Sequence, residues 1–168
     1  MVVIESARLM MRPLSRDDLD DFLALQSDPQ VAAFTRSFDR PGALARLAEI
    51  EQEWAQRGHG GMAVLERRSR RFLGRSGLKR WPQFGETEIG WSLHPGEWGH
   101  GYATEAARAI LEWGFESLPD PYFTAMVQPE NTRSAAVARR LGLEPLREDE
   151  LDGVPVVVYA IGRPASGG

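Results

Sequence analysis

The sequence contains no cysteine among its 168 residues. Disulfide bonds, thiolate-bound metal sites and a cysteine nucleophile are therefore excluded. No apolar run approaches the roughly 18–20 residues that a membrane helix needs, and the N-terminus lacks the basic and then apolar regions of a secretory signal. Positive charge is not in excess either, because 24 acidic residues outnumber 20 basic ones. Nucleic-acid binders usually present a basic face, so we expect no nucleic-acid partner. Because nothing in the sequence indicates export or membrane insertion, we also expect a cytoplasmic protein without a membrane partner.

What is present fits a single globular domain. Hydrophobic residues make up 42% and charged residues 26% of the chain, which are ordinary values for such a domain. No repeat or linker divides the sequence. We predict one domain over residues 1–163 and a flexible tail over residues 164–168. The sequence leaves a monomer and a homodimer equally open.

Hydrophobic periodicity and turn residues predict alternating strands and helices. Ser15 and Asp18 have the spacing of a capping box, and Gly58 and Gly142 stand where helices end. The strand–helix–strand part implies a parallel pair, whereas the meander and the final hairpin are antiparallel. We therefore predict an α/β (α+β) fold with one mixed, mostly antiparallel sheet and helices on both faces. The expected strands are residues 2–12, 61–66, 71–78, 86–93, 122–127, 143–150 and 154–161, and the expected helices are residues 15–28, 41–57, 102–117 and 134–141.

The segment of residues 97–106 is the most informative, because it places Gly99 and Gly101 between a strand and a helix. The first N–H groups of a helix are unpaired and carry partial positive charge, and glycine lets a phosphate approach them closely. The motif lies too late in the chain for a dinucleotide-binding fingerprint and lacks the Gly-Lys-Ser/Thr of a P-loop. Two interpretations remain, an anion site at the helix start and a tight glycine turn that binds nothing.

Three motifs together resemble the GCN5-related N-acetyltransferase (GNAT) superfamily. The central motif is EIGWSLHP at residues 88–95 with WGHGYATEA at residues 98–106, the second begins PENTRS at residues 129–134, and the opening is ARLMMRPL at residues 7–14. The resemblance covers nearly the whole chain. It is closest to the branch of the ribosomal-protein N-terminal serine/alanine acetyltransferases. It implies the GNAT acyl-CoA acyltransferase fold, acetyl-CoA as co-substrate and a primary amine as acceptor.

The resemblance also implies where acetyl-CoA binds. Gly101 and Ala103 match the last fixed positions of the family's pyrophosphate loop. Trp98 stands where the superfamily has Gln or Arg, as it often does in the branch named above. Asn131 matches a position that contacts the cofactor. The implied cofactor-binding residues are Ser92, Leu93, Trp98, Gly99, His100, Gly101, Tyr102, Ala103, Thr104 and Asn131.

Two residues are candidates for the chemistry. Glu88 lies on the strand that leads into the loop, and Gly90 beside it leaves room for a substrate. By resemblance Glu88 is the general base, directly or through water; the alternative is a solvated or Arg-paired glutamate. Ser134 matches a serine near the CoA sulfur and would hydrogen-bond the thiolate, unless it only caps the helix. Ala138 stands where many relatives have an acidic tyrosine.

The acceptor amine is less defined. Four residues in loops beside Glu88 are candidates to line its pocket, and the acceptor is a protein N-terminal α-amine or a small-molecule amine. An acidic pocket would suit polyamines or aminoglycosides, but the acidic run at residues 144–152 also fits a solvated strand and turn. The four candidate acceptor-binding residues are Arg36, Phe38, Trp81 and Phe84.

Two other function classes stay open. The missing tyrosine also fits a non-catalytic, regulatory acyl-CoA-binding module, and an unrelated α+β binding domain would use the glycine loop only as a turn. No metal site is predicted, because the three histidines lack the spacing of metal ligands.

Overall fold

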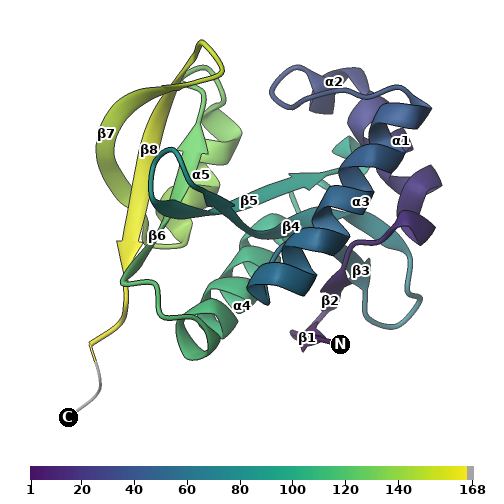
Figure 1. The fold of residues 1–168 in the computed structure, drawn as a ribbon, viewed down its shortest axis with the longest axis horizontal. Coiled ribbons are helices and arrows are strands. Elements are labelled where there is room, and N and C mark those ends of the chain that lie inside the picture. Colours follow the sequence, from purple (N-terminus) through teal and green to yellow (C-terminus); the bar gives the residue numbers. More distant parts are fainter. Residues whose placement is uncertain (166–168) are drawn as a thin grey trace.

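Eight strands in the described part of the chain, residues 1–165 of a computed structural model, join in one mixed sheet with helices on both faces (Figure 1). The order across the sheet is β1-β2-β3-β4-β5-β6-β8-β7. The predicted fold class is therefore confirmed. The strands are β1 (Ile4–Glu5), β2 (Leu9–Pro13), β3 (Gly61–Glu66), β4 (Phe72–Trp81), β5 (Glu86–Leu93), β6 (Tyr122–Val127), β7 (Glu144–Leu151) and β8 (Val154–Gly162), and the helices are α1 (Leu19–Ser27), α2 (Pro29–Ala32), α3 (Arg40–Arg57), α4 (Tyr102–Ser117) and α5 (Thr132–Arg140), with 3-10 turns η1 (Arg16–Asp18) and η2 (Pro95–Glu97).

Strand β3 explains why helices cover both faces of the sheet. Met62 and Val64 pack in an apolar cluster that includes buried residues of α4. Ala63 and Leu65 pack in a second cluster with buried residues of α1 and α3. Because successive strand residues point to opposite faces, each cluster lies on its own side of the sheet. The sheet thus separates an α4 face from an α1–α3 face.

The start of the chain differs from its prediction. The single strand expected over residues 2–12 is wrong, because the chain turns back and forms the β1–β2 hairpin, with Ile4 opposite Met11. The N–H of Ser6 donates to the carbonyl of Leu9 at 3.0 Å and closes this turn. The Ser6 hydroxyl also donates to Glu105 of α4 at 2.6 Å. A partner far along the chain therefore fixes the turn, and local periodicity does not reveal it.

Helix α2 and the end of β4 were also missed by periodicity. Pro29 follows the end of α1, but it occupies the first position of α2, where its missing N–H costs no hydrogen bond. The side chain of Asp28 accepts from the N–H of Gln30 at 2.9 Å and caps this short helix. Strand β4 runs to Trp81, beyond the predicted end at residue 78. The predicted capping box of Ser15 and Asp18 is confirmed.

The middle of the sheet forks between β5 and β6. These parallel strands pair at Glu88 and Thr124, whereas β4 and β5 pair at eight positions. Helix α4 follows β5 through η2, and α5 follows β6. Because the carboxyl ends of parallel strands lie at the same edge of a sheet, the starts of both helices come to the mouth of the fork (Figure 1).

The predicted tail covers residues 164–168. Residues 164 and 165 lie outside helices and strands, and residues 166–168 lie outside the described residues. In the described chain no helix combines the length and apolar character that a membrane crossing requires.

Candidate functional site

A groove of about 840 Å³ runs past the starts of α4 and α5. Gly99 and Gly101 line it with φ angles of 82° and 78°, a region that favours glycine. Gly101 is the N-cap of α4, and no side chain caps this helix. The first N–H groups of α4, at Tyr102, Ala103 and Thr104, therefore line the groove without a side-chain partner.

The groove fits an anionic ligand. A Cβ placed on Gly99 would meet no atom within 4 Å, so the backbone there is open to a close approach. Four arginine side chains also line the groove, at Arg8, Arg108, Arg133 and Arg140. Unpaired N–H groups at a helix start and nearby guanidinium groups are a suitable environment for a diphosphate. The residues present thus fit the phosphates of coenzyme A.

Trp98 braces the loop that carries the glycines. Its indole N–H donates to the carbonyl of Leu93 at 3.0 Å and ties the loop to the end of β5. The guanidinium of Arg133 lies 3.8 Å from the centre of the Trp98 ring. This stacking joins the start of α5 to the loop before α4. Trp98 and Leu93 both line the groove.

The N-cap of α5 is Asn131, and not Ser134, which the sequence suggested as a candidate for this role. The side chain of Asn131 accepts from the N–H of Ser134 at 3.2 Å, so Asn131 is the N-cap and α5 begins at Thr132. Ser134 is half-buried in the first turn but does not line the groove. Ala138 is fully buried in the core. The role of Ser134 at the CoA sulfur stays a prediction.

The predicted cofactor-binding residues divide into two groups. Ser92 and His100 do not line the groove. Ser92 faces Arg75 across β4 and β5, and His100 is exposed beside the ring of Tyr102. The other eight line it, although their contact with a cofactor stays a prediction: Leu93, Trp98, Gly99, Gly101, Tyr102, Ala103, Thr104 and Asn131.

Glu88 lies at the fork between β5 and β6. One carboxylate oxygen accepts from the indole N–H of Trp81 at 2.9 Å, and the other accepts from the backbone N–H of Met126 at 3.1 Å. Burial raises the pKa of Glu88 above its ordinary value, while these two hydrogen bonds favour the charged form and oppose the shift. A partly buried carboxylate of this kind is a stronger proton acceptor than a solvated one.

The α1–α3 face around Glu88 is polar and carries positive charge. Lys79 lies directly opposite Glu88, and Arg75 lies on the same face of β4. The side chain of Arg75 donates to Gln26 of α1 at 3.0 Å. Burial lowers the pKa of Lys79 and lowers that of Arg75 to about 10. Neither cation forms an ion pair within residues 1–165.

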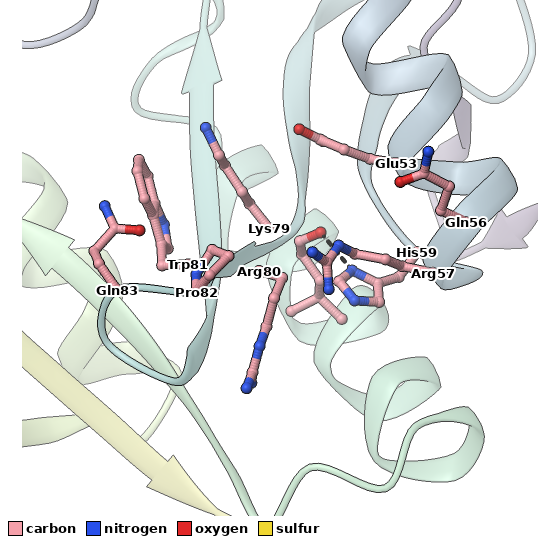
Figure 2. Close-up of a pocket in the computed structure, with 10 residues that line it drawn as sticks. Glu53, Gln56, Arg57, His59, Lys79, Arg80, Trp81, Pro82 and Gln83 are labelled. Atoms are coloured by element: carbon pink, nitrogen blue, oxygen red, sulfur yellow. Dashed lines mark hydrogen bonds between the residues drawn. The ribbon is translucent and has the colours of Figure 1, made fainter.

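The four candidate acceptor-binding residues form two pairs. Trp81 contacts Glu88, and its ring lies 6.5 Å from that of Phe84. The guanidinium of Arg36 lies 5.0 Å from the ring of Phe38, which packs against the core around α1 and α3. Of the four, Trp81 alone lines a described cavity, a small one beside β4 that Figure 2 shows. A single acceptor pocket made by all four stays a prediction.

Several site residues escaped sequence reasoning. Arg8 lies in the opening motif and Arg133 in the second motif, and both line the groove. The presence of a cationic residue in each motif could have indicated that these side chains face an anionic ligand. Glu105 accepts from the N–H of Arg8 at 2.9 Å and from its guanidinium at 2.7 Å, and so positions Arg8 in the groove. Lys79 was missed because the predicted strand ended one residue before it.

Comparison with known proteins identifies the family of the chain. The acetyltransferase (GNAT) domain family matches residues 8–144. The Bacillus subtilis protein YkkB is 33% identical over an alignment of 150 residues, and the match covers 80% of this chain and 87% of YkkB. A crystal structure of an acetyltransferase from Agrobacterium tumefaciens is 32% identical with a TM-score of 0.84, and the match covers 96% of this chain and 94% of that one.

The fold also extends to an enzyme of the ribosomal-protein branch. RimL, a ribosomal α-N-protein acetyltransferase solved in complex with coenzyme A, matches with a TM-score of 0.81 over 96% of this chain and 98% of its own. Its sequence is 16% identical, so this match shows a shared fold. The resemblance to the GNAT superfamily is confirmed by the family match, and the chain belongs to this family of acetyltransferases.

Proposed function

We propose that this acetyltransferase moves the acetyl group of acetyl-CoA to a primary amine by direct attack, with Glu88 as the general base. The observation that carries the proposal is the position of Glu88 at the fork of the sheet, where its partly buried carboxylate has a raised pKa. The groove that fits coenzyme A extends to Leu93, at the end of the same strand. The cofactor and the base thus share β5.

The roles of the chain's own residues follow from this placement. Backbone N–H groups from Gly99 to Thr104 hold the diphosphate, and the fixed orientation of thioester and amine supplies much of the rate. The amine nitrogen forms a bond to the acetyl carbon while the bond from that carbon to sulfur breaks. Glu88 takes the proton from the amine, directly or through water. Ser134 is the candidate to hydrogen-bond the departing thiolate.

The acceptor is a protein N-terminal α-amine or a small-molecule amine. The ribosomal branch of the family and the fold shared with RimL support the first, and the polar side chains beside Glu88 on the sheet support the second. Several further points stay predictions. They are a cytoplasmic location, a monomeric or homodimeric state, and action on one of these amines without a nucleic-acid, membrane or metal partner.

Release of free CoA thiol tests the activity. The protein is incubated with acetyl-CoA and a panel of N-terminal peptides, polyamines and aminoglycosides. We expect thiol release with at least one amine, and an N-acetylated product in the mass spectrum. CoA binding without thiol release from any amine would instead support a regulatory acyl-CoA-binding module.

A substitution of Glu88 tests the base. Glu88→Gln is expected to lower kcat by about 10²–10⁴-fold, the typical contribution of a positioned general base. It should also remove the acidic limb of the pH profile of kcat/KM. A variant that keeps both the wild-type rate and the wild-type profile would remove Glu88 from the reaction.

A further inference from the structure

A second cavity, of about 330 Å³, lies between the end of α3 and the turn that joins β4 to β5 (Figure 2). Three cationic side chains line it, those of Arg57, Lys79 and Arg80, together with one carboxylate, that of Glu53. The whole chain has a net charge of -4. The cavity is therefore locally positive on an acidic protein, and a local field of this sign favours a negatively charged ligand.

Lys79 has no anionic partner in this cavity. Its ammonium lies 4.1 Å from the centre of the Trp81 ring, and no carboxylate of residues 1–165 lies within ion-pair distance. Arg80 pairs with Asp120 at 3.7 Å, and one oxygen of Glu53 accepts from Arg46 at 2.9 Å, while its other oxygen is buried without a hydrogen-bond partner among the described residues. The carboxylates of Glu53 and Glu88 act on Lys79 from beyond ion-pair distance, so its half-buried ammonium remains available for direct contact with a ligand anion.

The cavity adjoins the base of the proposed reaction. Lys79 lies opposite Glu88 in the pairing of β4 with β5, and the Cα atoms of such a pair are about 4.5–5.5 Å apart. Trp81 forms part of the cavity wall and donates to the carboxylate of Glu88. Arg75 lies on the same face and forms no ion pair of its own within the described residues. If the amine of a ligand lies at Glu88, a second polar group on the same ligand would therefore lie beside the cationic side chain of Lys79 or Arg75.

We propose that the acceptor is an amine that also carries a carboxylate or phosphate group, which Lys79 binds while the amine faces Glu88. Arg75 adds positive charge on the same side. This inference rests on the proposed acetyl transfer at Glu88 and narrows its substrate class. It selects against polyamines and aminoglycosides, whose additional ammonium groups would be repelled by both cations.

Matched acceptors test the substrate class. The first set has one short aliphatic chain and contains γ-aminobutyrate, its neutral amide, aminopropyl phosphate and putrescine. The second set contains the dipeptides Ser-Asp and Ser-Asn, which present the same α-amine with and without an adjacent carboxylate. We expect kcat/KM to be at least about tenfold higher for the anionic members, chiefly through KM, because a charge-assisted hydrogen bond is worth about 1.5–3 kcal/mol.

Substitutions assign that preference to Lys79. Lys79→Gln should lower the ratio of kcat/KM for the anionic acceptor to that for its neutral analogue about tenfold, and Lys79→Arg should restore it. Arg75→Gln should lower the same ratio to a smaller extent. Arg68→Gln is the matched control, because it removes one charge from an exposed turn residue far from the cavity and should leave the ratio unchanged. Unchanged affinity for CoA verifies that each variant is folded.

Three results would overturn the inference. Equal use of anionic and neutral acceptors, or a preference for putrescine, would refute the substrate class while leaving acetyl transfer in place. A ratio that Lys79→Gln does not change would refute the role of Lys79. CoA binding without thiol release from any amine would refute the proposed function itself, and this inference with it.

Discussion

Replacing Gly101 with alanine adds one methyl group at the residue that caps α4. A Cβ at this position would lie 3.6 Å from the guanidinium of Arg8, which lines the groove, so the methyl group enters the space assigned to the diphosphate. Gly101 has a φ of 78°, and any L-residue there costs about 1–2 kcal/mol of backbone strain. Gly153 in the β7–β8 turn has a φ of 79° and open space around it, and it therefore provides a matched control.

The two substitutions should separate strain from ligand binding. Both are expected to lower the free energy of unfolding by about 1–2 kcal/mol, and so to lower Tm by roughly 2–8 °C. Gly101→Ala alone should also weaken CoA binding, because the methyl group removes one or two charge-assisted hydrogen bonds to phosphate. At about 1.5–3 kcal/mol each, their loss raises Kd at least about tenfold to a hundredfold.

Isothermal titration calorimetry with CoA measures Kd for the wild type and both variants, and thermal unfolding measures their stability. Equal Kd values for Gly101→Ala and Gly153→Ala would refute the assignment of the groove. A loss of affinity in both variants would mean that the effect arises from general destabilisation.

Three further predictions follow from single contacts. Trp81→Phe removes a hydrogen bond that lowers the pKa of Glu88, so the acidic limb of kcat/KM should move to higher pH; a limb that stays in place would contradict this. Arg147 holds the pKa of Glu86 below its ordinary value, and the side chain of Glu86 is 6% exposed. The ionised Glu86 carboxylate therefore stabilises the folded state fully above about pH 4.3, and this stabilisation disappears as pH falls through the lowered pKa. Denaturant titrations should show that Glu86→Gln lowers the free energy of unfolding by about 1–3 kcal/mol at pH 7 and by less near pH 3. Gly114→Ala should destabilise by about 1–3 kcal/mol in the same assay, because its Cβ would lie 2.7 Å from a side-chain atom of β4; unchanged stability would show that the α4 face can rearrange.

The sequence predicts most of the fold because its helix ends and strand alternation are locally encoded. The capping box at Ser15 and the left-handed glycine at Gly58 begin and end helical regions as expected. The β1–β2 turn escaped prediction because Glu105, about a hundred residues away, holds it. Helix α2 escaped because Pro29 fits both the end of one helix and the start of the next.

The candidate site is predictable to the extent that backbone conformation creates it. Gly99 and Gly101 lie in one local sequence motif, and they indicate a helix start whose backbone N–H groups are accessible to a ligand. The environment of Glu88 depends on strand pairing, which places Lys79 opposite it and brings the N–H of Met126 from another strand. No local pattern encodes these contacts, so the cationic cavity beside the base emerges only in three dimensions.

A crystal structure of the protein with coenzyme A tests the central claim most directly. The account predicts diphosphate oxygens within about 2.7–3.2 Å of main-chain nitrogens between Gly99 and Thr104, in the groove at the start of α4. Coenzyme A bound elsewhere, or with its diphosphate out of reach of these nitrogens, would contradict it.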